Sequence, residues 1–472
     1  MDPLVKLIPE DDWDYVRTQS DTKSVRRTER LTVAQLTLSS QAWSYVLHRR
    51  ASSLGRIEWY GRHVKSVSWC SEEDSELSRA SAVELLMHLP DHIQLLPNVR
   101  SFTWTERRLP ASPSNLNSKL FANSGLQSLT LTMGLAEVHP LADILDVVKI
   151  QCPRLATLQL VGDGIAPLDV AASAALADLV RSTNLIHFTC TCPLFDEVLV
   201  AVARSISLKY VAIRIAWYTL DSIVVRMLPS RCFPSVQDLE LQLEILDTSS
   251  LVLLKRLTSD KVANLALHVM SEDNDDDLLM EHLDVIAKAP FASTLRKIEL
   301  HAWRTGTQSD EDDSNPCTVT LNTLRPLLAL KQLTHFIVHA RNFSLTSQDV
   351  RTIASSLPNL DTLELMPSLV LGTEPPAEAL LHLAELCSHL TLVALPITTA
   401  FGVPRMEQGW KSKSPVTMYT IVTSQDISGD PQISSYISAL FPASPIEDMY
   451  TRVDPFDEFE GSHTAPSAQL WA

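Results

Sequence analysis

Long apolar runs are missing from this sequence of 472 residues, and none approaches the 18 apolar residues of a membrane-spanning helix. The start, Met1-Asp2-Pro3-Leu4, also lacks the basic and then apolar pattern of a secretory signal. We therefore expect no membrane partner and a cytoplasmic or nuclear location. In that compartment the seven scattered cysteines are predicted to be reduced thiols.

Basic residues are also scarce, because 39 Lys and Arg stand against 56 Asp and Glu, for a net charge of −17. A chain this acidic repels phosphate backbones, so nucleic acid is not an expected partner. Glycine-rich phosphate loops and the serine- and zinc-hydrolase motifs are absent too. We expect a protein that is not an enzyme, with no catalytic residue, no cofactor and no metal. An enzyme with an unrecognised site is an alternative.

What the sequence does contain is a repeated spacing of apolar residues at offsets 0, +3 and +5, as in Leu126, Leu129 and Leu131. The first positions of twelve such copies are Val64, Val99, Leu126, Leu155, Leu185, Leu208, Val236, Val262, Leu295, Leu333, Leu360 and Leu390. The mean period is about 30 residues, within the range of leucine-rich repeats once insertions are allowed.

The offsets predict a strand in every copy, because positions +3 and +5 lie on one face of a strand. Between copies the apolar spacing becomes helical, as in Leu141 to Val148. The expected fold is α/β: a leucine-rich-repeat solenoid, or horseshoe, with a parallel sheet on the concave side and helices on the convex side. A doubly wound α/β protein is the alternative, but its buried strands are usually continuous apolar runs.

Side chains at offsets +2, +4 and +6 are expected on the concave face. Early repeats place small hydroxyl residues there, whereas later repeats place larger polar residues. The candidate partner-binding surface consists of Tyr210, Arg214, Asp238, Glu240, Gln242, His268, Lys297, Glu299, His301, His335, His339 and Glu364.

Three of these residues, His268, His301 and His339, share offset +6, so their rings are expected to stack on neighbouring strands about 4.8 Å apart. One interpretation is a recognition patch that responds to pH near neutrality. A zinc site is a sharper alternative. A solvated polar ladder without a function is the third.

The N-terminal residues do not follow the repeat. Pro9-Glu10 precedes Trp13 and Val16 at helical spacing, and Leu36-x-Leu38-x-Ser40-x-x-Trp43 suggests a second amphipathic helix. In this order the features resemble an F-box. Residues 61–69 resemble the first repeat of fungal, basidiomycete-type F-box/leucine-rich-repeat proteins, and residues 433–442 resemble their closing helix.

The resemblance implies a degenerate F-box that docks the adaptor of a cullin-RING ubiquitin ligase, while the repeats hold a protein substrate. The residues that would contact the adaptor are Pro9, Trp13, Val16, Leu36, Leu38 and Trp43. A helical cap that closes the first repeat is the structural alternative. A scaffold for protein–protein interaction, unrelated to ubiquitination, is the alternative function.

We predict four segments along the chain. They are a helical F-box-like segment over 1–55, the solenoid over 56–400, a closing unit over 401–459 and a disordered tail over 460–472. Two acidic runs, 272–277 and 309–314, lack the glycine and the distal glutamate of a calcium loop and are predicted to be solvated.

Overall fold

The computed structural model divides the chain into two compact units, Met1–Val236 and Gln237–Ala472, described here one at a time. The residues that the structure describes are 35–37, 63–70, 96–106, 122–133, 141–162, 168–216, 226–270, 276–302, 318–367, 374–398, 402–406, 410, 412–423, 431–442 and 450–452. The division falls inside the segment 56–400, which the sequence predicts to be one solenoid.

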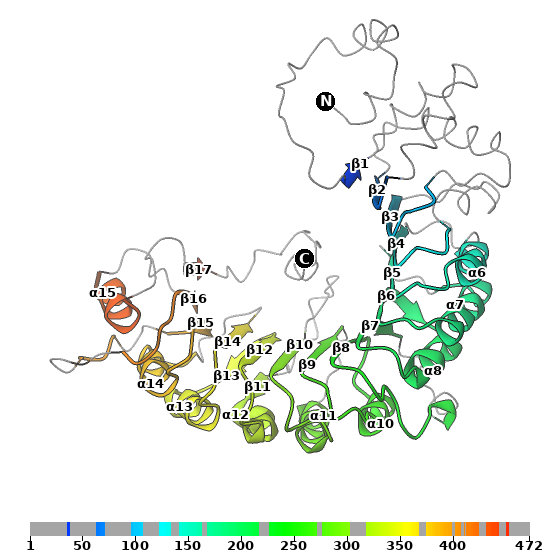
Figure 1. Cartoon of the computed structure of the whole chain (residues 1–472). Coiled ribbons are helices and arrows are strands. Elements are labelled where there is room, and N and C mark those ends of the chain that lie inside the picture. The colour runs from blue at the N-terminus through cyan, green and yellow to red at the C-terminus, as the bar shows by residue number, and fades with distance from the viewer. Residues whose placement is uncertain are drawn as a thin grey trace, which may run out of the picture. The chain divides into compact units, whose positions relative to one another are not determined.

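The first unit is built on a parallel sheet in which each strand pairs with the next one along the chain. Its strands are β1 (Gln35–Thr37), β2 (Ser66–Cys70), β3 (Ser101–Glu106), β4 (Ser128–Met133), β5 (Thr157–Gly162), β6 (His187–Leu194) and β7 (Tyr210–Ile215). Its helices are α6 (Leu141–Gln151), α7 (Val170–Ser182) and α8 (Asp196–Arg204), and they lie together on one side of the sheet (Figure 1).

The second unit is also built on parallel strands, each paired with the next in the order given below. In order across the sheet, its strands are β8 (Asp238–Leu243), β9 (Asn264–Val269), β10 (Lys297–Ala302), β12 (His335–Ala340), β14 (Thr362–Pro367), β15 (Leu392–Pro396), β16 (Met418–Thr423) and β17 (Tyr450–Arg452). A separate parallel pair consists of β11 (Thr318–Thr320) and β13 (Asn342–Ser344).

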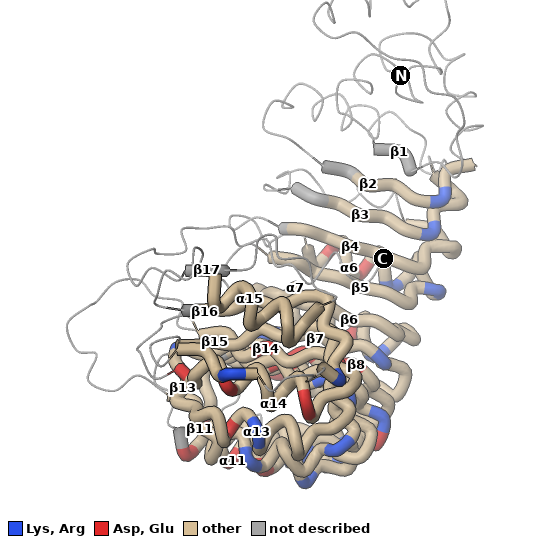
Figure 2. Tube along the Cα trace, turned by 90° about the vertical axis from the view of Figure 1, so that its left-hand side faces the viewer, with Lys and Arg blue, Asp and Glu red and all other residues tan. Residues whose placement is uncertain are grey.

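Helices cover one side of the sheet in the second unit (Figure 1). They are α10 (Thr248–Lys255), α11 (Asp276–Lys288), α12 (Leu321–Leu324), the 3-10 helix η4 (Arg325–Ala329), α13 (Ser347–Ser356), α14 (Glu378–Leu386) and α15 (Pro431–Leu440). Both acidic and basic residues occur on α11 and α13, whereas α15 has neither (Figure 2). Among the described residues, no helix is long and apolar enough to cross a membrane.

The apolar grid of the sequence forms the core of both units. Every residue at offsets 0, +3 and +5 whose side chain is described is buried, from Val64 and Val67 to Val393 and Leu395. The α/β fold with strand and helix repeated along a parallel sheet is therefore confirmed.

Neighbouring repeats are joined by a recurring hydrogen-bond pattern just before each strand. The backbone carbonyl at offset +1 accepts the N–H groups at +1 and +2 of the next repeat. Ala263 O, for example, accepts from Arg296 N at 2.8 Å and Lys297 N at 3.0 Å, and Arg296 O then accepts from Thr334 N and His335 N. One carbonyl thus fixes the register of two repeats whatever the length of the helical segment between them.

The sheet of the second unit continues beyond residue 400, where the sequence places a closing unit. Strand β16 pairs with β15 through Leu392↔Met418 and Val393↔Tyr419. Val416, Tyr419 and Ile421 are buried at the offsets of a further repeat. A helix is present where the closing helix is predicted: it is α15, where the buried Tyr436 donates from Oη to Ala377 O at 3.1 Å.

The prediction of helices over residues 1–55 is wrong where the structure describes that segment. Gln35–Thr37 form strand β1, and Leu36 pairs in parallel with Val67 of β2. The physical reason is visible in the sequence, because Val33, Leu36 and Leu38 have the 0/+3/+5 spacing of the repeats. The tail over 460–472 and the acidic run over 309–314 lie outside the described residues.

Candidate functional site

The candidate site is one face of the sheet in the second unit, on strands β8, β9, β10, β12 and β14. Because side chains alternate along a strand, the buried residues at +3 and +5 direct those at +2, +4 and +6 to the opposite face. We call this surface the polar face. Its members are Asp238, Glu240, Gln242, His268, Lys297, Glu299, His301, His335, His339 and Glu364, and all ten are partly buried.

Strand register arranges these residues in rows across the sheet. In the +4 row, Glu240 lies beside Ala266 and Ala266 beside Glu299. Ile337 then separates Glu299 from Glu364. Ala266 and Ile337 are buried although they point to the polar face. Carboxylates therefore occupy every second strand, about 10 Å apart at the backbone, since neighbouring strands are about 4.8 Å apart.

The three histidines at +6 form a contiguous row, as the sequence predicts. Register places His301 between His268 and His339. The ring centroids of His268 and His301 are 4.4 Å apart with 15° between the planes, which is a stacked arrangement. Those of His301 and His339 are 4.5 Å apart at 61°, an edge-to-face arrangement. We call these three residues the histidine row.

Two members of the histidine row are held neutral at physiological pH. Burial, together with the neighbouring His268, His339 and Lys297, lowers the pKa of His301 to about 3. Burial also lowers the pKa of His268, against the opposing effect of Glu240 and Glu299. The interpretation of a switch near neutrality is therefore wrong for these two residues, because burial lowers both pKa values and at His268 outweighs the nearby carboxylates.

The carboxylates of the polar face contact an amide, two imidazole rings and one lysine. Glu240 accepts from Gln242 Nε2 at 3.0 Å, and its Oε1 lies 3.6 Å from His268 Nε2. Glu364 Oε2 lies 3.6 Å from His339 Nε2. Glu299 differs, because Lys297 Nζ lies 2.9 Å from its Oε1.

Among the ten residues, four carboxylates thus face one lysine, a formal charge of −3 while the histidines are neutral.

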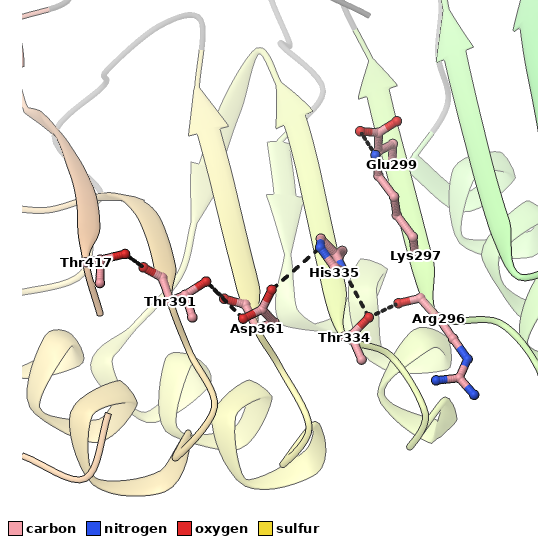
Figure 3. Close-up of polar contacts among 8 residues, drawn as sticks. All are labelled: Arg296, Lys297, Glu299, Thr334, His335, Asp361, Thr391 and Thr417. Carbon is pink, nitrogen blue, oxygen red and sulfur yellow. Dashed lines mark hydrogen bonds and ion pairs between the residues drawn. The ribbon is translucent and has the colours of Figure 1, made fainter. Parts of the chain in front are cut away.

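A polar chain crosses the sheet at the N-terminal edge of the strands (Figure 3). Thr391 Oγ1 donates to Asp361 Oδ1 at 2.9 Å, and Asp361 Oδ2 lies 3.7 Å from His335 Nε2. Thr334 Oγ1 then lies 2.9 Å from His335 Nδ1 and donates to Arg296 O at 3.1 Å. Burial lowers the pKa of His335, against the effect of Asp361. Thr334, Asp361 and Thr391 are not among the predicted site residues, because they stand at offset +1, just before each strand, where alternation along a strand does not predict which face a side chain is on.

Metal binding has no candidate in the described part of the chain, where no group of three or more His, Cys, Asp or Glu is arranged to hold an ion. In the histidine row, His268 and His301 stack face to face, so their nitrogens do not converge on one point. His187, Cys190 and Cys192 do not converge either, because both cysteines are buried and His187 is exposed.

An apolar cavity lies behind the histidine row, between the sheet and helices α11 and α12. Its lining includes Leu267, Leu300 and Val338 of the sheet and His282 of α11. His282 uses both ring nitrogens within the protein: Nδ1 lies 2.7 Å from Leu278 O, and Nε2 lies 2.8 Å from Ser250 Oγ. The cavity therefore directs no set of polar groups at a ligand, which sets it apart from most binding pockets.

The remaining predicted residues lie elsewhere. Tyr210 and Arg214 are partly buried on β7, in the first unit. Pro9, Trp13, Val16, Leu38 and Trp43 lie outside the described residues, and Leu36 lies in β1. The polar face therefore brings together ten of the twelve residues predicted for partner binding.

The sequence analysis also missed the apolar end of the same face. Strands β15 and β16 continue the +2 row with Leu392 and Met418, which are paired in register. Met418 is 55% exposed, unusual for a large apolar side chain. The sequence does contain the spacing that locates Met418, because Val416, Tyr419 and Ile421 stand at offsets 0, +3 and +5 of a thirteenth copy.

Comparison with known proteins adds little to this description. No protein-family model matches the chain, and no curated protein sequence does. A crystal structure of a protein from Bacteroides fragilis is similar over 75% of this chain and 82% of that chain, with 12% identity and a TM-score of 0.27. A likeness of this size carries no argument about function, so the polar face must be interpreted from its own residues.

Proposed function

We propose that this chain is a non-catalytic receptor of the leucine-rich-repeat class, which binds another protein on the polar face. The observation that carries the proposal is the display of four carboxylates and the histidine row by five neighbouring strands. Parallel strands in fixed register offer a rigid surface for a protein ligand, and stacked repeats are commonly used in this way.

The protonation of the histidine row supports binding over catalysis. A general base works best when its pKa is near the operating pH. His301 has a pKa of about 3, so its nitrogen is a weak base at neutral pH. Its ring is also in contact with His268 and His339. A neutral imidazole in this position is better suited to packing and hydrogen bonding against a partner than to transferring protons.

A second candidate function is that of substrate-recognition subunit of a cullin-RING ubiquitin ligase. It is supported by the resemblance of residues 1–55 to an F-box and by the closing helix α15. The strand at Leu36 weakens one part of that resemblance, since this residue pairs with Val67. The remaining adaptor positions are Pro9, Trp13, Val16, Leu38 and Trp43. A scaffold that never meets the ligase is the alternative.

Affinity capture with cross-linking on the full-length chain tests the receptor proposal. The bait is compared with His301→Ala, with Glu364→Gln and with the control His389→Ala, whose ring is exposed outside the polar face. We expect one cross-linked partner. The amount captured should fall at least fivefold with each of the first two variants and stay the same with the control. A partner that all three variants retain would contradict the proposal.

Binding of the purified ligase adaptor to the full-length chain separates the two functions. If the chain is a ligase subunit, Trp13→Ala and Trp43→Ala each weaken adaptor binding, whereas Trp410→Ala does not. Absence of adaptor binding to the unmodified chain leaves the receptor proposal standing and removes its assignment to the ligase.

A further inference from the structure

The spacing of carboxylates on the polar face indicates what kind of segment it binds. Glu240, Glu299 and Glu364 occupy every second strand of the +4 row. Across the sheet, the backbone of Glu299 is therefore about 10 Å from that of Glu240, and the backbone of Glu364 is about 19 Å from that of Glu240. A polyproline-II segment has three residues per turn and a rise of about 3.1 Å, so its side chains at i, i+3 and i+6 share a face at about 9 Å intervals.

The charge of the polar face favours a basic ligand. Four carboxylates stand against Lys297. Glu240 contacts the amide of Gln242 and the ring of His268, whose pKa is lowered by burial, and Glu364 lies 3.6 Å from the ring of His339. On the helix side of the same unit, Lys255 pairs with Glu281 at 3.6 Å and Lys288 with Asp284 at 2.6 Å. The net negative charge of the polar face complements Lys or Arg.

The apolar end of the face gives the ligand a direction. Leu392 and Met418 lie on the first and second strands beyond Glu364, in the neighbouring +2 row. Two strands correspond to about 10 Å, again about three residues of a polyproline-II segment. An apolar ligand side chain at i+9 would cover Met418, which is otherwise 55% exposed.

We infer that the segment bound on the polar face is a basic, polyproline-II-like stretch with Lys or Arg at i, i+3 and i+6 and an apolar residue at i+9. This inference rests on the proposed receptor function and names its class of ligand. The outer two cations lie at Glu240 and Glu364. The middle cation competes with Lys297 for Glu299, so this position contributes least.

The test measures fluorescence anisotropy of labelled peptides with the full-length chain. The matching peptide contains Arg-Pro-Ala three times, followed by Leu, with Gly at each end. One comparison peptide has the same composition with its three Arg adjacent, and others replace Arg by Ser or by Glu. We expect the matching peptide to bind at least fivefold more tightly than all comparison peptides, and added salt to weaken it.

Variants then locate the peptide on the face. Glu240→Gln and Glu364→Gln should each weaken the matching peptide roughly fivefold. Glu281→Gln, on helix α11, is the matched control and should leave binding unchanged. Met418→Ser should weaken binding of the peptide that contains Leu and leave unchanged the binding of a version in which Ser replaces that Leu. Circular dichroism confirms that each variant is folded.

The outcomes separate this inference from the receptor proposal. Equal binding of the matching and rearranged peptides, or no effect of Glu240→Gln and Glu364→Gln, overturns the inference. If capture of a partner nevertheless depends on His301 and Glu364, the receptor proposal stands with a different ligand. If neither peptides nor captured partner respond to any variant of the face, both are wrong.

Discussion

The imidazole of His301 stacks on that of His268, with ring centroids 4.4 Å apart and planes inclined by 15°. This contact has an electrostatic consequence, because two adjacent rings cannot both accept a proton without repulsion. Together with burial, it keeps His301 neutral down to a pH of about 3. In the unfolded chain the same side chain titrates near pH 6.5.

Acid should therefore destabilise the protein through His301. Because its folded-state pKa is lowered, the unfolded state binds the proton first, so stability is fully present above about pH 6.5 and is lost as pH falls toward 3. At pH 5 the loss from this residue is about 2 kcal/mol relative to pH 7.5. Denaturant unfolding of the protein and of His301→Gln at both pH values measures it.

In that experiment the difference between the two pH values should shrink by about 2 kcal/mol in His301→Gln. His389→Gln removes an exposed histidine and should leave the difference as it is. If His301→Gln left the difference in unfolding free energy unaltered, the ring of His301 would have to be protonated at pH 5 in the folded protein.

Ser250→Ala should destabilise the second unit by about 1–3 kcal/mol, since the hydroxyl joins two helices. Ser250 Oγ accepts from Asp247 N at 3.0 Å, donates to Asp247 O at 2.9 Å and lies 2.8 Å from His282 Nε2. Removal of the hydroxyl leaves the backbone of Asp247 and the ring of His282 with fewer hydrogen-bond partners. Ser355→Ala, at an exposed site on α13, is the control and should change the unfolding free energy little. Equal effects of the two would contradict the inter-helix role.

Gly162→Ala should destabilise the first unit by about 1–3 kcal/mol, because a Cβ there would lie 2.5 Å from Cys192 Sγ. The sulfur is buried on β6 and has little room to move. The double variant Gly162→Ala with Cys192→Ala should recover much of that loss. A double-mutant cycle of unfolding free energies gives the coupling, and purely additive effects would place the cost elsewhere.

Thiol reactivity should be low in the folded protein. Cys152, Cys190, Cys192, Cys232 and Cys387 are all buried free thiols. Burial raises the pKa of Cys152 to about 11 and that of Cys387 to about 12, which suppresses the reactive thiolate. Of the seven cysteines, no more than two, Cys70 and Cys317, should react with a chromogenic disulfide reagent before denaturant is added. A third fast thiol would contradict this prediction.

The sequence predicted the parts of this protein that depend on a constant offset. Leu363 and Leu365 are buried and His301 lies beside His339, because strands in one register convert equal spacing into proximity. The same spacing extends beyond the twelve predicted copies. Val416, Tyr419 and Ile421 form a further copy, and Leu36, which the sequence predicts in a helix, lies in a strand.

Other contacts have no periodic signal and could not have been predicted. Ser250 and His282 are separated by 32 residues and meet only because α10 and α11 pack side by side. The neutrality of His301 depends on how deeply its ring is buried, a property of its surroundings that its own offset does not reveal. The sequence shows which repeats carry a carboxylate at offset +4, but the distance between those carboxylates depends on the order of the strands in the sheet.

The shared carbonyl before each strand has a consequence for how such a protein can change over evolution. Since Ala263 O and Arg296 O fix the alignment of successive repeats, residues can be gained or lost in the helical segments without moving the rows. Deleting or duplicating a whole repeat would instead shift the rows by one strand. The polar face can therefore be lengthened or shortened only by whole repeats. The spacing of the side chains on a ligand must then match a whole number of strands.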